Sequence, residues 1–522
     1  MQLTQGIHRS ARQNPDGIAT IDGARQRSWR SVAQDIAQLA ALLRAKGIEP
    51  DARVAVLANN SDHYFDSYFA IFWAGAVIVP LNTRLSVPEL QFQLQDVGAG
   101  TLLVGDGFAE VGAALVAVCP GLQLIHLDEA GGSLRQQAAG MIPLDDTGRS
   151  DADLAGVFYT GGTTGLPKGV MLTHRNLVSV ANNLIMMIRF DSACINLHCA
   201  PMFHLADIGL FTVTMTGGTH VFAPRLDPPT ILELTARHRV THVFTVPAVI
   251  DALTRADLAA YDLSSLRMLG YGGSPMPAAT IARAQDRLPG IEFIQGFGMT
   301  EMPSLTFLLP EHHRIDSGLS KLRSAGVPGY GFEVKVVNPA GREVPRGKVG
   351  EIVGRGPCVM AGYWNRPEES AMALRDGWMH SQDAGFMDED GFITITDRLK
   401  DMIVSGAENI YSIEVENALG LHPLVHECTV IGLPDERWGE RVHAIVVPVD
   451  GSDPQVDDLL AHLHQHIARY KCPKSWEIRH APLPRSPVGK VLKAQLRRAH
   501  ANPARAEAAG NDAPPAAMGA SA

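Results

Sequence analysis

Short apolar runs alternate with helix-length amphipathic segments along most of the chain. Consecutive apolar side chains predict strands at residues 54–57, 77–79, 101–104, 122–126, 243–246 and 266–269. Apolar positions recurring every three to four residues predict helices at 62–73 and 88–97, between strands. This strand–helix–strand alternation is typical of parallel sheets covered by helices. We therefore predict an α/β fold, with a large N-terminal domain of parallel sheets sandwiched by helices.

The pattern changes in the last third of the chain. Shorter strands separated by turns are predicted at 333–337, 351–354 and 391–396, and a domain boundary near 398. Beyond it, helices at 411–419 and 456–467 and strands at 427–432 and 442–449 predict a compact α+β domain of about 100 residues. The predicted division is a domain at 1–398, a small mobile domain at 399–500, and a disordered tail of small residues and prolines at 501–522.

Composition excludes several classes of protein. The chain has 522 residues, and its 45 basic and 55 acidic residues give a net charge of −10, which argues against a nucleic-acid-binding protein. Its most apolar stretch, 68–81, is shorter than the ~20 residues of a membrane helix and contains Gly75 and Pro80. Six cysteines without CxxC spacing indicate reduced thiols. We expect a large globular cytoplasmic protein with no membrane span.

The segment 159–169, Tyr-Thr-Gly-Gly-Thr-Thr-Gly-Leu-Pro-Lys-Gly, carries the strongest chemical signal. Glycines let backbone amides approach an anion, threonine hydroxyls add donors, and Lys168 adds a point charge suited to phosphate. An apolar strand at 154–158 precedes it and a helical pattern follows it. It differs from the Walker pattern because Pro167 precedes the lysine and Gly169 follows it. A flexible surface loop is the alternative, but the whole string favours a loop that binds a polyphosphate.

This string resembles the signature loop of the adenylate-forming (AMP-binding) superfamily, and within it the acyl-CoA synthetase or fatty-acid–CoA ligase branch. The usual form begins Tyr-Thr-Ser-Gly-Thr-Thr-Gly, and here Gly161 replaces the serine. The resemblance covers roughly residues 10–498. It implies that ATP is bound by Thr160, Gly161, Gly162, Thr163, Thr164, Gly165 and Lys168.

Two further motifs follow in the family's order. Residues 270–275, Gly-Tyr-Gly-Gly-Ser-Pro, resemble the adenine-side loop and imply nucleotide contacts from Gly272 and Gly273. Residues 295–301, Gln-Gly-Phe-Gly-Met-Thr-Glu, resemble the next motif, usually with tyrosine where Phe297 stands. The resemblance implies that Phe297 stacks on adenine, Thr300 contacts the α-phosphate region, and Glu301 binds Mg²⁺, a hard cation that prefers oxygen ligands.

Three motifs near the C-terminus complete the set. Residues 376–385 resemble the ribose-binding motif, in which Asp383 accepts hydrogen bonds from both hydroxyls and Gln382 replaces the usual glycine. Residues 396–403 resemble the hinge motif, with Arg398 contacting ribose or phosphate and Lys400 as the hinge. Without the resemblance, Asp397 and Arg398 would be interpreted as a surface ion pair.

Residues 484–493, Pro-Arg-Ser-Pro-Val-Gly-Lys-Val-Leu-Lys, match the family's catalytic-lysine motif at Lys490. A carboxylate attacking the α-phosphate builds negative charge there, and a cation stabilises that transition state more than the ground state. The catalytic residues implied are Lys490, Glu301 and Lys168.

The resemblance also implies an acyl pocket and a CoA channel. The expected pocket residues are His204, Asp207, Ile208, Phe211, Tyr271, Gly296, Met302 and Pro303. Most are apolar, and no lysine or arginine is placed to pair a second carboxylate, which favours a monocarboxylic acid. The expected CoA residues are Ser405, Gly406, Ala407 and Trp438, with Ala407 at a position usually occupied by glycine. His462, His464 and His466 lie close together in sequence and could suggest a metal site. Only His462 and His466 share a helical face, and no third ligand is evident, so no metal site is expected there.

The implied reaction has two steps. A monocarboxylic fatty or aromatic acid and ATP–Mg²⁺ give acyl-AMP and pyrophosphate, and after rotation about Lys400 the CoA thiolate takes the acyl group. An adenylating enzyme that passes the acyl group to a carrier protein or an amine is the alternative. We expect an acid–thiol ligase of fatty-acid metabolism, monomeric or homodimeric.

Overall fold

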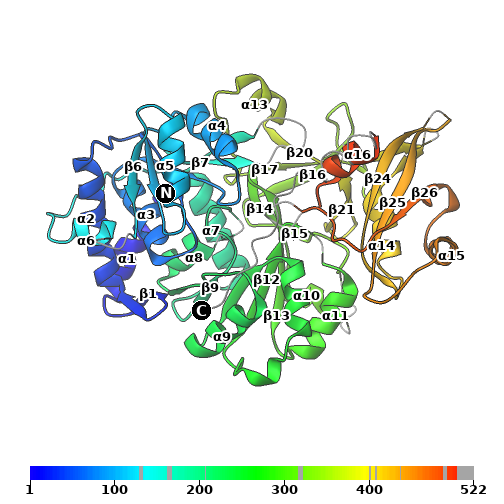
Figure 1. Cartoon of the computed structure of the whole chain (residues 1–522), viewed down its shortest axis with the longest axis horizontal. Helices are drawn as coiled ribbons and strands as arrows, with labels where there is room; N and C mark the ends of the chain where they lie inside the picture. Colours follow the sequence, from blue (N-terminus) through cyan, green and yellow to red (C-terminus); the bar gives the residue numbers. More distant parts are fainter. Residues whose placement is uncertain are drawn as a thin grey trace. The chain divides into compact units, whose positions relative to one another are not determined.

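The structure is a computed structural model of the whole chain, and it describes residues 1–128, 133–160, 167–205, 207, 209–274, 276–315, 321–398, 401–405, 408–435, 437–485 and 491–501. The chain divides into two compact units. The first consists of residues 1–381 and 386–394, and the second of 382–385 together with the chain from 395 onward (Figure 1). The short segment 382–385 therefore belongs with the C-terminal part of the chain, which sequence reasoning did not anticipate.

Two large sheets form the first unit. The seven-stranded sheet has the order β18 (Gly362–Tyr363), β8 (Lys168–Thr173), β7 (Leu154–Thr160), β4 (Val77–Pro80), β3 (Arg53–Leu57), β5 (Thr101–Val104) and β6 (Gln123–His126). Its strands from β7 to β6 pair in parallel, and β8 and β18 add antiparallel pairs at the other end. The nine-stranded sheet has the order β15 (Val327–Pro328), β14 (Met302–Leu308), β13 (Glu292–Met299), β12 (Met268–Gly272), β11 (His242–Thr245), β9 (Ile195–His198), β10 (Thr219–Phe222), β1 (Ile18–Asp22) and β2 (Arg25–Ser28). Its strands from β13 to β1 pair in parallel.

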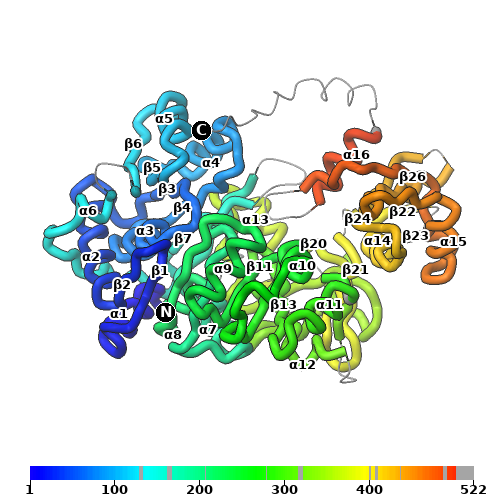
Figure 2. Tube along the Cα trace, turned by 60° about the horizontal axis from the view of Figure 1, so that its bottom comes forward, coloured from blue at the N-terminus to red at the C-terminus, as the bar shows by residue number. Residues whose placement is uncertain are grey.

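Helices cover both faces of these sheets (Figures 1 and 2). They are α1 (Gln5–Gln13), α2 (Trp29–Ala45), α3 (Asp62–Trp73), α4 (Val87–Val97), α5 (Ala109–Val118), α6 (Leu134–Ala138), α7 (His174–Ile188), α8 (Gly209–Thr216), α9 (Pro228–His238), α10 (Pro247–Arg255), α11 (Ala278–Arg287), α12 (Pro310–His313) and α13 (Pro367–Ala373), with a 3₁₀ turn at Leu258–Ala260. Figure 2 shows α4 and α5 on one side of the seven-stranded sheet and α2, α3 and α6 on the other.

The two-residue period of a strand explains this double cover. In β3, Val54 and Val56 belong to the large core cluster that includes α2 and α3, whereas Ala55 and Leu57 pack with α4 and α5. All four side chains are fully buried. Successive strand residues point to opposite faces, so a strand covered on both sides is apolar at every position. A third cluster joins β11 and β12 to α9, α10 and α11.

A smaller sheet closes the first unit and leads to the second. It has the order β16 (Glu333–Val337), β17 (Gly350–Arg355), β20 (Trp378–Met387) and β19 (Leu374–Arg375), with β21 (Ile393–Arg398) beside β20. The second unit has a sheet of β23 (Glu408–Ile410), β22 (Ile403–Ser405), β25 (Gly439–Pro448) and β24 (Val425–Asp435), with β26 (Ser475–Ile478) also pairing β25. Its helices are α14 (Ser412–Leu419), α15 (Val456–His466) and α16 (Lys493–Ala501), with a 3₁₀ turn at Arg469–Lys471.

The predicted fold class is confirmed, and the individual elements agree closely with the sequence pattern. The helix predicted at 62–73 has the same bounds in the structure, where Ser61 accepts a hydrogen bond from the Tyr64 amide as the N-cap. The helical pattern that follows the phosphate loop corresponds to α7, and strand β8, which the sequence pattern did not predict, lies between that loop and the helix. The predicted tail, 501–522, lies outside the described residues apart from its first.

An ion cluster of opposite charges is buried beside α3. The guanidinium of Arg27 donates to both oxygens of Asp66 at 2.9 and 3.0 Å and to Asp35 at 3.0 Å, and its Nε lies 3.3 Å from Asp62. Arg135 also donates to Asp66. Burial disfavours the charge of Arg27, but the surrounding carboxylates outweigh it and raise the pKa of the guanidinium. The cluster ties β2 to α2, α3 and α6.

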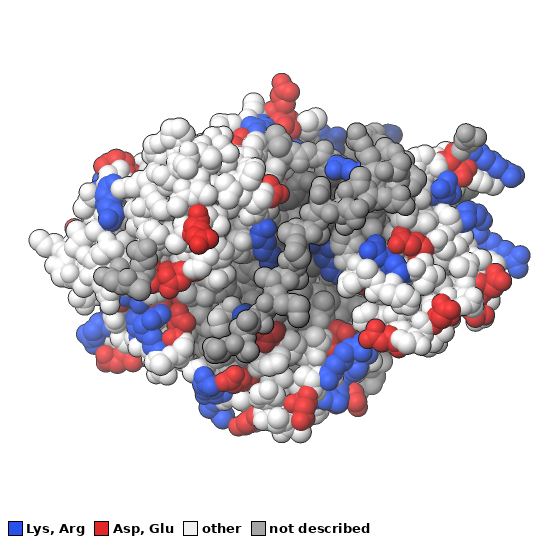
Figure 3. Space-filling view, viewed as in Figure 1, with Lys and Arg blue, Asp and Glu red and all other residues white. Residues whose placement is uncertain are grey.

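Six cysteines carry free thiols, at positions 119, 194, 199, 358, 428 and 472. Burial raises the pKa of each of them, to about 12 for Cys199 and Cys358. Across the described residues, every helix is too short or too polar to cross a bilayer. On the face drawn in Figure 3, basic and acidic side chains alternate instead of gathering into one basic patch.

Candidate active site

The predicted phosphate loop joins two antiparallel strands. Thr160 ends β7 and faces Lys168, which begins β8, and the Thr160 hydroxyl lies 3.4 Å from the carbonyl oxygen of Lys168. Because β7 runs parallel to β4, Thr160 lies at a carboxyl edge of the sheet, where α/β proteins bind ligands. The predicted ligands between these strands, Gly161, Gly162, Thr163, Thr164 and Gly165, lie outside the described residues.

Tyr363 connects Lys168 to Glu301. The Lys168 ammonium lies 5.0 Å from the centre of the Tyr363 ring, and the Tyr363 hydroxyl donates to Glu301 Oε1 at 2.8 Å. Burial and the nearby carboxylate raise the pKa of Tyr363, so its hydroxyl remains a donor at neutral pH. Glu301 itself is only 6% exposed. Three segments far apart in sequence thus place an ammonium over the face of one aromatic ring and a buried carboxylate at its hydroxyl group.

Glycines allow the predicted adenine-side strands to approach each other. Gly272 ends β12 opposite Gly296 of β13, and a Cβ on Gly272 would lie 2.8 Å from the Gly296 carbonyl oxygen. Gly273 follows with φ of +79°, a backbone conformation that favours glycine. Phe297, near the end of β13, is half-buried. Since β12 and β13 are parallel, these residues all lie at the carboxyl edge of the nine-stranded sheet.

Thr300 and Glu301 form the tight turn between β13 and β14. The Met360 amide donates to the Glu301 carbonyl at 2.8 Å, which fixes the turn from outside the hairpin. The catalytic-motif residues from Phe297 to Glu301 are therefore set by strand pairing rather than by a free loop.

The predicted acyl-pocket residues fall into separate groups. Phe211, on α8, packs its ring against the rings of Tyr68 and Phe72, at centroid distances of 6.0 and 6.4 Å, and Met302 is fully buried in the same cluster. Tyr271 belongs to a different cluster, and its hydroxyl lies 3.0 Å from Nε2 of His313. His204 is half-buried in the loop before α8, and Pro303 is buried in β14. Ile208 lies outside the described residues.

Asp207 has a partner that the sequence did not suggest. Both of its carboxylate oxygens lie 2.8 Å from Nδ1 of His198, whose Nε2 lies 2.9 Å from Nδ1 of His220. The other nitrogen of His220 lies 3.2 Å from the Thr214 hydroxyl. All four side chains are buried, so the chain of hydrogen bonds satisfies polar groups inside the core. The hydrogen bonds of Asp207 thus fix the segment before α8 to the end of β9.

The predicted ribose residues form an ion pair in the second unit. Arg398 Nε lies 2.6 Å from Asp383 Oδ1, and Asp383 is 3% exposed. Asp397 does not pair with Arg398 through its side chain; it accepts from the backbone amides of Arg398 and Ser412. Gln382 has φ of +61°, which explains why a glycine suits this position. Lys400 lies outside the described residues.

Two of the predicted CoA residues lie side by side. Ser405 of β22 pairs with Gly439, the first residue of β25, and Trp438 immediately precedes that glycine. The Trp438 side chain is 41% exposed, and the Arg437 guanidinium lies 4.7 Å from its ring centre. An exposed tryptophan beside a cation offers a stacking surface and a positive charge to a nucleotide. Gly406 and Ala407 lie outside the described residues.

The residues that flank Lys490 are paired, although Lys490 itself lies outside the described residues. Arg485 bridges Val491, and the Leu492 amide donates to the Pro484 carbonyl at 2.8 Å. The neighbouring Lys493 has a different environment, since its ammonium lies 2.8 Å from Glu416. Burial lowers the pKa of Lys493, but Glu416 and Asp397 outweigh that effect and raise it. Lys493 is therefore a structural lysine within the same motif.

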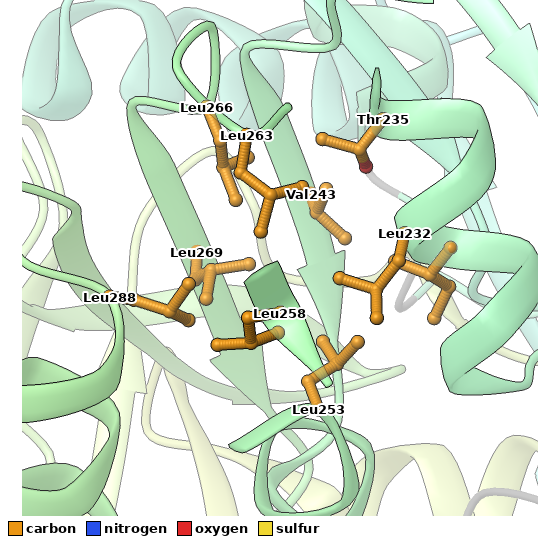
Figure 4. A pocket seen from close by; sticks show the side chains of 10 residues that line it. Leu232, Thr235, Val243, Leu253, Leu258, Leu263, Leu266, Leu269 and Leu288 are labelled. Carbon is orange, nitrogen blue, oxygen red and sulfur yellow. The ribbon is translucent and has the colours of Figure 1, made fainter. Parts of the chain in front are cut away.

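Two cavities can be described, and neither coincides with these residues. One of about 10 Å³ lies among the leucines of α9, α10, β11 and β12, and it has room for one water molecule at most (Figure 4). A shallow hollow of about 520 Å³ is lined by Glu333, Lys335, Trp378 and neighbours, none of them a predicted site residue. The first is a packing gap in the core, and neither marks the acyl site.

Comparison with known protein families identifies the family to which this chain belongs. The family model described as AMP-binding enzyme matches residues 7–364, and the one described as AMP-binding enzyme C-terminal domain matches 414–490. The chain belongs to the AMP-binding enzyme family. The predicted family is thereby confirmed.

Relatives of this AMP-binding enzyme point to its branch. It is 42% identical over 498 residues to a feruloyl-CoA synthase of Amycolatopsis sp, covering 94% of this chain and 97% of that protein. It is 36% identical over 501 residues to the fatty acid–[acyl-carrier-protein] ligase ScoC of Streptomyces coeruleorubidus, covering 95% and 96%. Among solved structures, o-succinylbenzoate CoA synthetase (MenE) of Bacillus subtilis, in complex with the acyl-adenylate intermediate OSB-AMP, matches with a TM-score of 0.84 at 30% identity over 94% and 97% of the two chains. The predicted class, an AMP-forming acid–CoA ligase, is confirmed.

Tyr363 is the site residue that sequence reasoning missed in this AMP-binding enzyme. It lies in the string Gly362-Tyr-Trp-Asn-Arg366, which shows no helical or strand periodicity. Two adjacent aromatic side chains in an irregular segment are the feature of the sequence that could have indicated a site residue here. Its partners become visible only when β18 pairs with β8.

Proposed function

We propose that this chain activates an aromatic monocarboxylic acid as its acyl adenylate and transfers the acyl group to CoA. The observation that carries the proposal is the 42% identity to a feruloyl-CoA synthase, which extends over almost the full length of both chains. The region 199–224 around the proposed acyl pocket contains no lysine or arginine, which supports an acid with a single carboxylate. The buried aromatic rings around Phe211 support an apolar acyl group.

In the first step, a carboxylate oxygen of the acid attacks the α-phosphorus of ATP, and the bond to pyrophosphate breaks. We assign Thr160, Lys168 and the intervening loop to the phosphates that leave, and Lys490 to the charge that develops on the α-phosphate. Phe297 and Gly272 are assigned to adenine, and Asp383 and Arg398 to the ribose. The Asp383–Arg398 ion pair supports this assignment because each residue fixes the orientation of the other.

Glu301 fits the Mg²⁺ that accompanies ATP. Its buried carboxylate supplies the oxygen ligand that this cation prefers, and Tyr363 orients it with a hydrogen bond at 2.8 Å. The ion supplies positive charge to the phosphate oxygens when bound. Glu301 and Tyr363 provide a fixed site for that charge before the substrate arrives.

In the second step, the CoA thiolate attacks the acyl carbonyl and AMP leaves with its electron pair. Trp438 and Ser405 are assigned to CoA because they lie together on the surface of the second unit. We further propose that the enzyme acts in the cytoplasm, because ATP and CoA are available there and six free thiols suit a reducing compartment.

A panel of acids tests this function. We expect pyrophosphate release with hydroxycinnamic acids to exceed that with long-chain fatty acids and dicarboxylic acids, and a thioester to form only when CoA is added. Pyrophosphate release with no thioester for any active acid would instead favour transfer to a carrier protein or an amine. Equal activity with long-chain fatty acids would contradict the aromatic assignment while leaving the ligase class intact.

A further inference from the structure

A cluster of potential metal ligands lies in the second unit, on elements that the proposed reaction does not use. His443 of β25, Glu477 of β26 and His500 of α16 each offer a ligand atom, and these atoms all lie within 4.8 Å of one another. The three residues are far apart in sequence, so no spacing motif reveals them. Two imidazoles and a carboxylate form a donor set that suits divalent transition metals such as Zn²⁺.

Strand pairing places two of the ligands on one face. β25 and β26 are parallel, with His443 opposite Ser475 and Ile445 opposite Glu477. Side chains two residues apart in a strand share a face, so His443 and Glu477 point to the same side of the sheet.

Helix α16 brings the third ligand to that face. Leu496 of α16 packs there with Ile445 and Val447 in a buried cluster. His500 follows Leu496 by four residues, which is one helical turn, and therefore lies on the same side of the helix. The ring centres of His500 and His443 are 4.5 Å apart.

His443 is oriented as metal-binding histidines usually are. Its Nδ1 lies 2.8 Å from the Ser475 hydroxyl, which in turn accepts from Arg441 Nε at 3.2 Å. Its Nε2 is buried and finds no hydrogen-bond partner among the residues that the structure describes, and His443 as a whole is 5% exposed. A buried nitrogen without a hydrogen-bond partner destabilises the folded protein. A ligand whose first nitrogen is fixed by a polar neighbour presents its second nitrogen to a metal.

Glu477 has the same arrangement. Its Oε2 lies 2.9 Å from His500 Nε2, and its Oε1 lies 3.7 Å from Arg479 Nη1. One oxygen therefore faces the cluster while an arginine outside the cluster contacts the other. In tetrahedral Zn²⁺ sites the ligand atoms are about 3.3–3.5 Å apart. The three ligand atoms, all within 4.8 Å of one another, are close to that spacing.

We propose that His443, Glu477 and His500 bind one divalent transition-metal ion of the Zn²⁺ class, with water as the fourth ligand. The ion links the C-terminal helix α16 to β25 and β26. Since α16 begins three residues after Lys490, the ion stabilises the end of the segment that carries the proposed catalytic lysine. This role is separate from the Mg²⁺ that accompanies ATP.

Zinc titration of the full-length protein tests the proposal. After EDTA treatment and desalting, calorimetry with ZnCl₂ is expected to show one site per chain, while MgCl₂ shows none at this position. His500→Gln and Glu477→Gln, which change partly exposed residues, are each expected to weaken Zn²⁺ binding at least about tenfold. The matched control is His466→Gln on α15, where His462 and His466 form another close pair of histidines, with ring centres 4.4 Å apart. This variant is expected to bind Zn²⁺ as the parent does.

Thermal unfolding provides a second measurement that does not depend on activity. Zn²⁺ at a saturating concentration is expected to raise the Tm of the parent and of His466→Gln but not that of His500→Gln, because only a ligand that binds the folded state stabilises it. Unchanged Zn²⁺ affinity in both His500→Gln and Glu477→Gln would overturn the proposal. Loss of binding in His466→Gln, or no binding by the parent protein, would overturn it as well.

Discussion

At the scale of single residues, Lys490 and Lys493 have opposite roles within one short motif. Lys493 is buried against Glu416, whereas Lys490 is the residue assigned to the transition state. Replacing Lys490 should therefore affect mainly the rate of the reaction, and replacing Lys493 mainly the stability of the fold.

We expect Lys490→Ala to lower acyl-AMP formation about a hundredfold or more, because a preorganised charge at the α-phosphate is lost. Transfer of the acyl group from supplied acyl-AMP to CoA should remain close to the parent rate. Lys493→Met should instead lower the free energy of unfolding by about 3 kcal/mol, since it removes the cation from the carboxylate of Glu416, which among the described residues then keeps only the Thr429 hydroxyl and the Val430 amide as donors. Single-turnover kinetics and denaturant unfolding measure the two effects, and equal loss of both half-reactions in Lys490→Ala would contradict its assignment.

Substitutions at Glu301 and Tyr363 test two different properties of the proposed Mg²⁺ site, the charge of the carboxylate and its orientation. Glu301→Gln keeps the shape of the side chain but removes the charge that is expected to bind Mg²⁺, so pyrophosphate release should fall and require more Mg²⁺. Tyr363→Phe removes only the hydrogen bond of 2.8 Å to Glu301 and should cost about tenfold, the value of one charge-assisted hydrogen bond. Rates measured across a range of Mg²⁺ concentrations distinguish the two variants. Identical Mg²⁺ dependence in both would mean that the Glu301 charge is not used.

Gln382 adopts a left-handed backbone conformation, with φ of +61°. A residue with a Cβ is less stable there than glycine by about 1–2 kcal/mol. Gln382→Gly should therefore be more stable than Gln382→Ala by about 1 kcal/mol, because the two variants lose the same polar side chain and differ only in the Cβ. Denaturant midpoints provide the measurement, and a more stable alanine variant would show that this turn carries no strain.

At the scale of elements, the buried ion cluster joins β2, α2, α3 and α6. Arg27→Met leaves Asp66 and Asp62 buried without this partner and should destabilise the protein by about 3–5 kcal/mol. Arg30→Met is the matched control, because Arg30 pairs with Asp16 on the surface, with side chains 65% and 85% exposed. Such exposed pairs contribute about 0–1 kcal/mol. Similar destabilisation by the two substitutions would mean that burial does not strengthen the cluster.

Elements with an unbroken local pattern were predicted from sequence with nearly correct bounds. The helix at 62–73 has a serine cap and a continuous apolar face, and the strand at 101–104 contains the apolar run 102–104 and is buried throughout, so the local sequence specifies both. β8 was missed because Pro167 and Gly169 conceal the alternation of Val170 and Leu172. Short strands of this kind depend on their partner, which here is β7.

The site was predictable where it rests on contiguous motifs and not where strand pairing creates it. Glu301 was identified within its motif, but its partner Tyr363 lies 62 residues away along the chain, on β18, and the two meet only in the folded structure. Asp383 and Arg398 were both predicted at the ribose, but their ion pair was not, because they lie on the two neighbouring strands β20 and β21. Contacts of that kind follow from sheet register, which one sequence does not encode locally.

At the scale of the whole molecule, buried neutral histidines make stability depend on pH. Burial lowers the pKa of His63, His174, His242 and His313 to about 4, from an ordinary value of 6.5. Between these values the unfolded chain binds protons that the folded chain does not, so stability is fully present above about pH 6.5 and decreases as the pH falls towards 4. Each group contributes about 1.4 kcal/mol per pH unit in that range.

The expected result is a Tm that decreases steadily as the pH is lowered from about 7 to about 5, within the range in which these histidines differ between the two states. His174→Gln should show a shallower decrease than the parent, because one of the four groups no longer titrates. The raised pKa values of Asp22 and Asp35 act in the opposite direction, so the comparison of the two slopes isolates the histidine. An unchanged slope in the variant would contradict the assignment.

The buried free thiols described above have a chemical consequence for an enzyme whose substrate is a thiol and whose product is a thioester. Nucleophilic attack on a thioester or a disulfide requires a thiolate, and burial keeps all six cysteines in the neutral thiol form at physiological pH. We therefore expect the cysteines of this protein to be acylated by its own product, and to form mixed disulfides with oxidised CoA, more slowly than exposed thiols would.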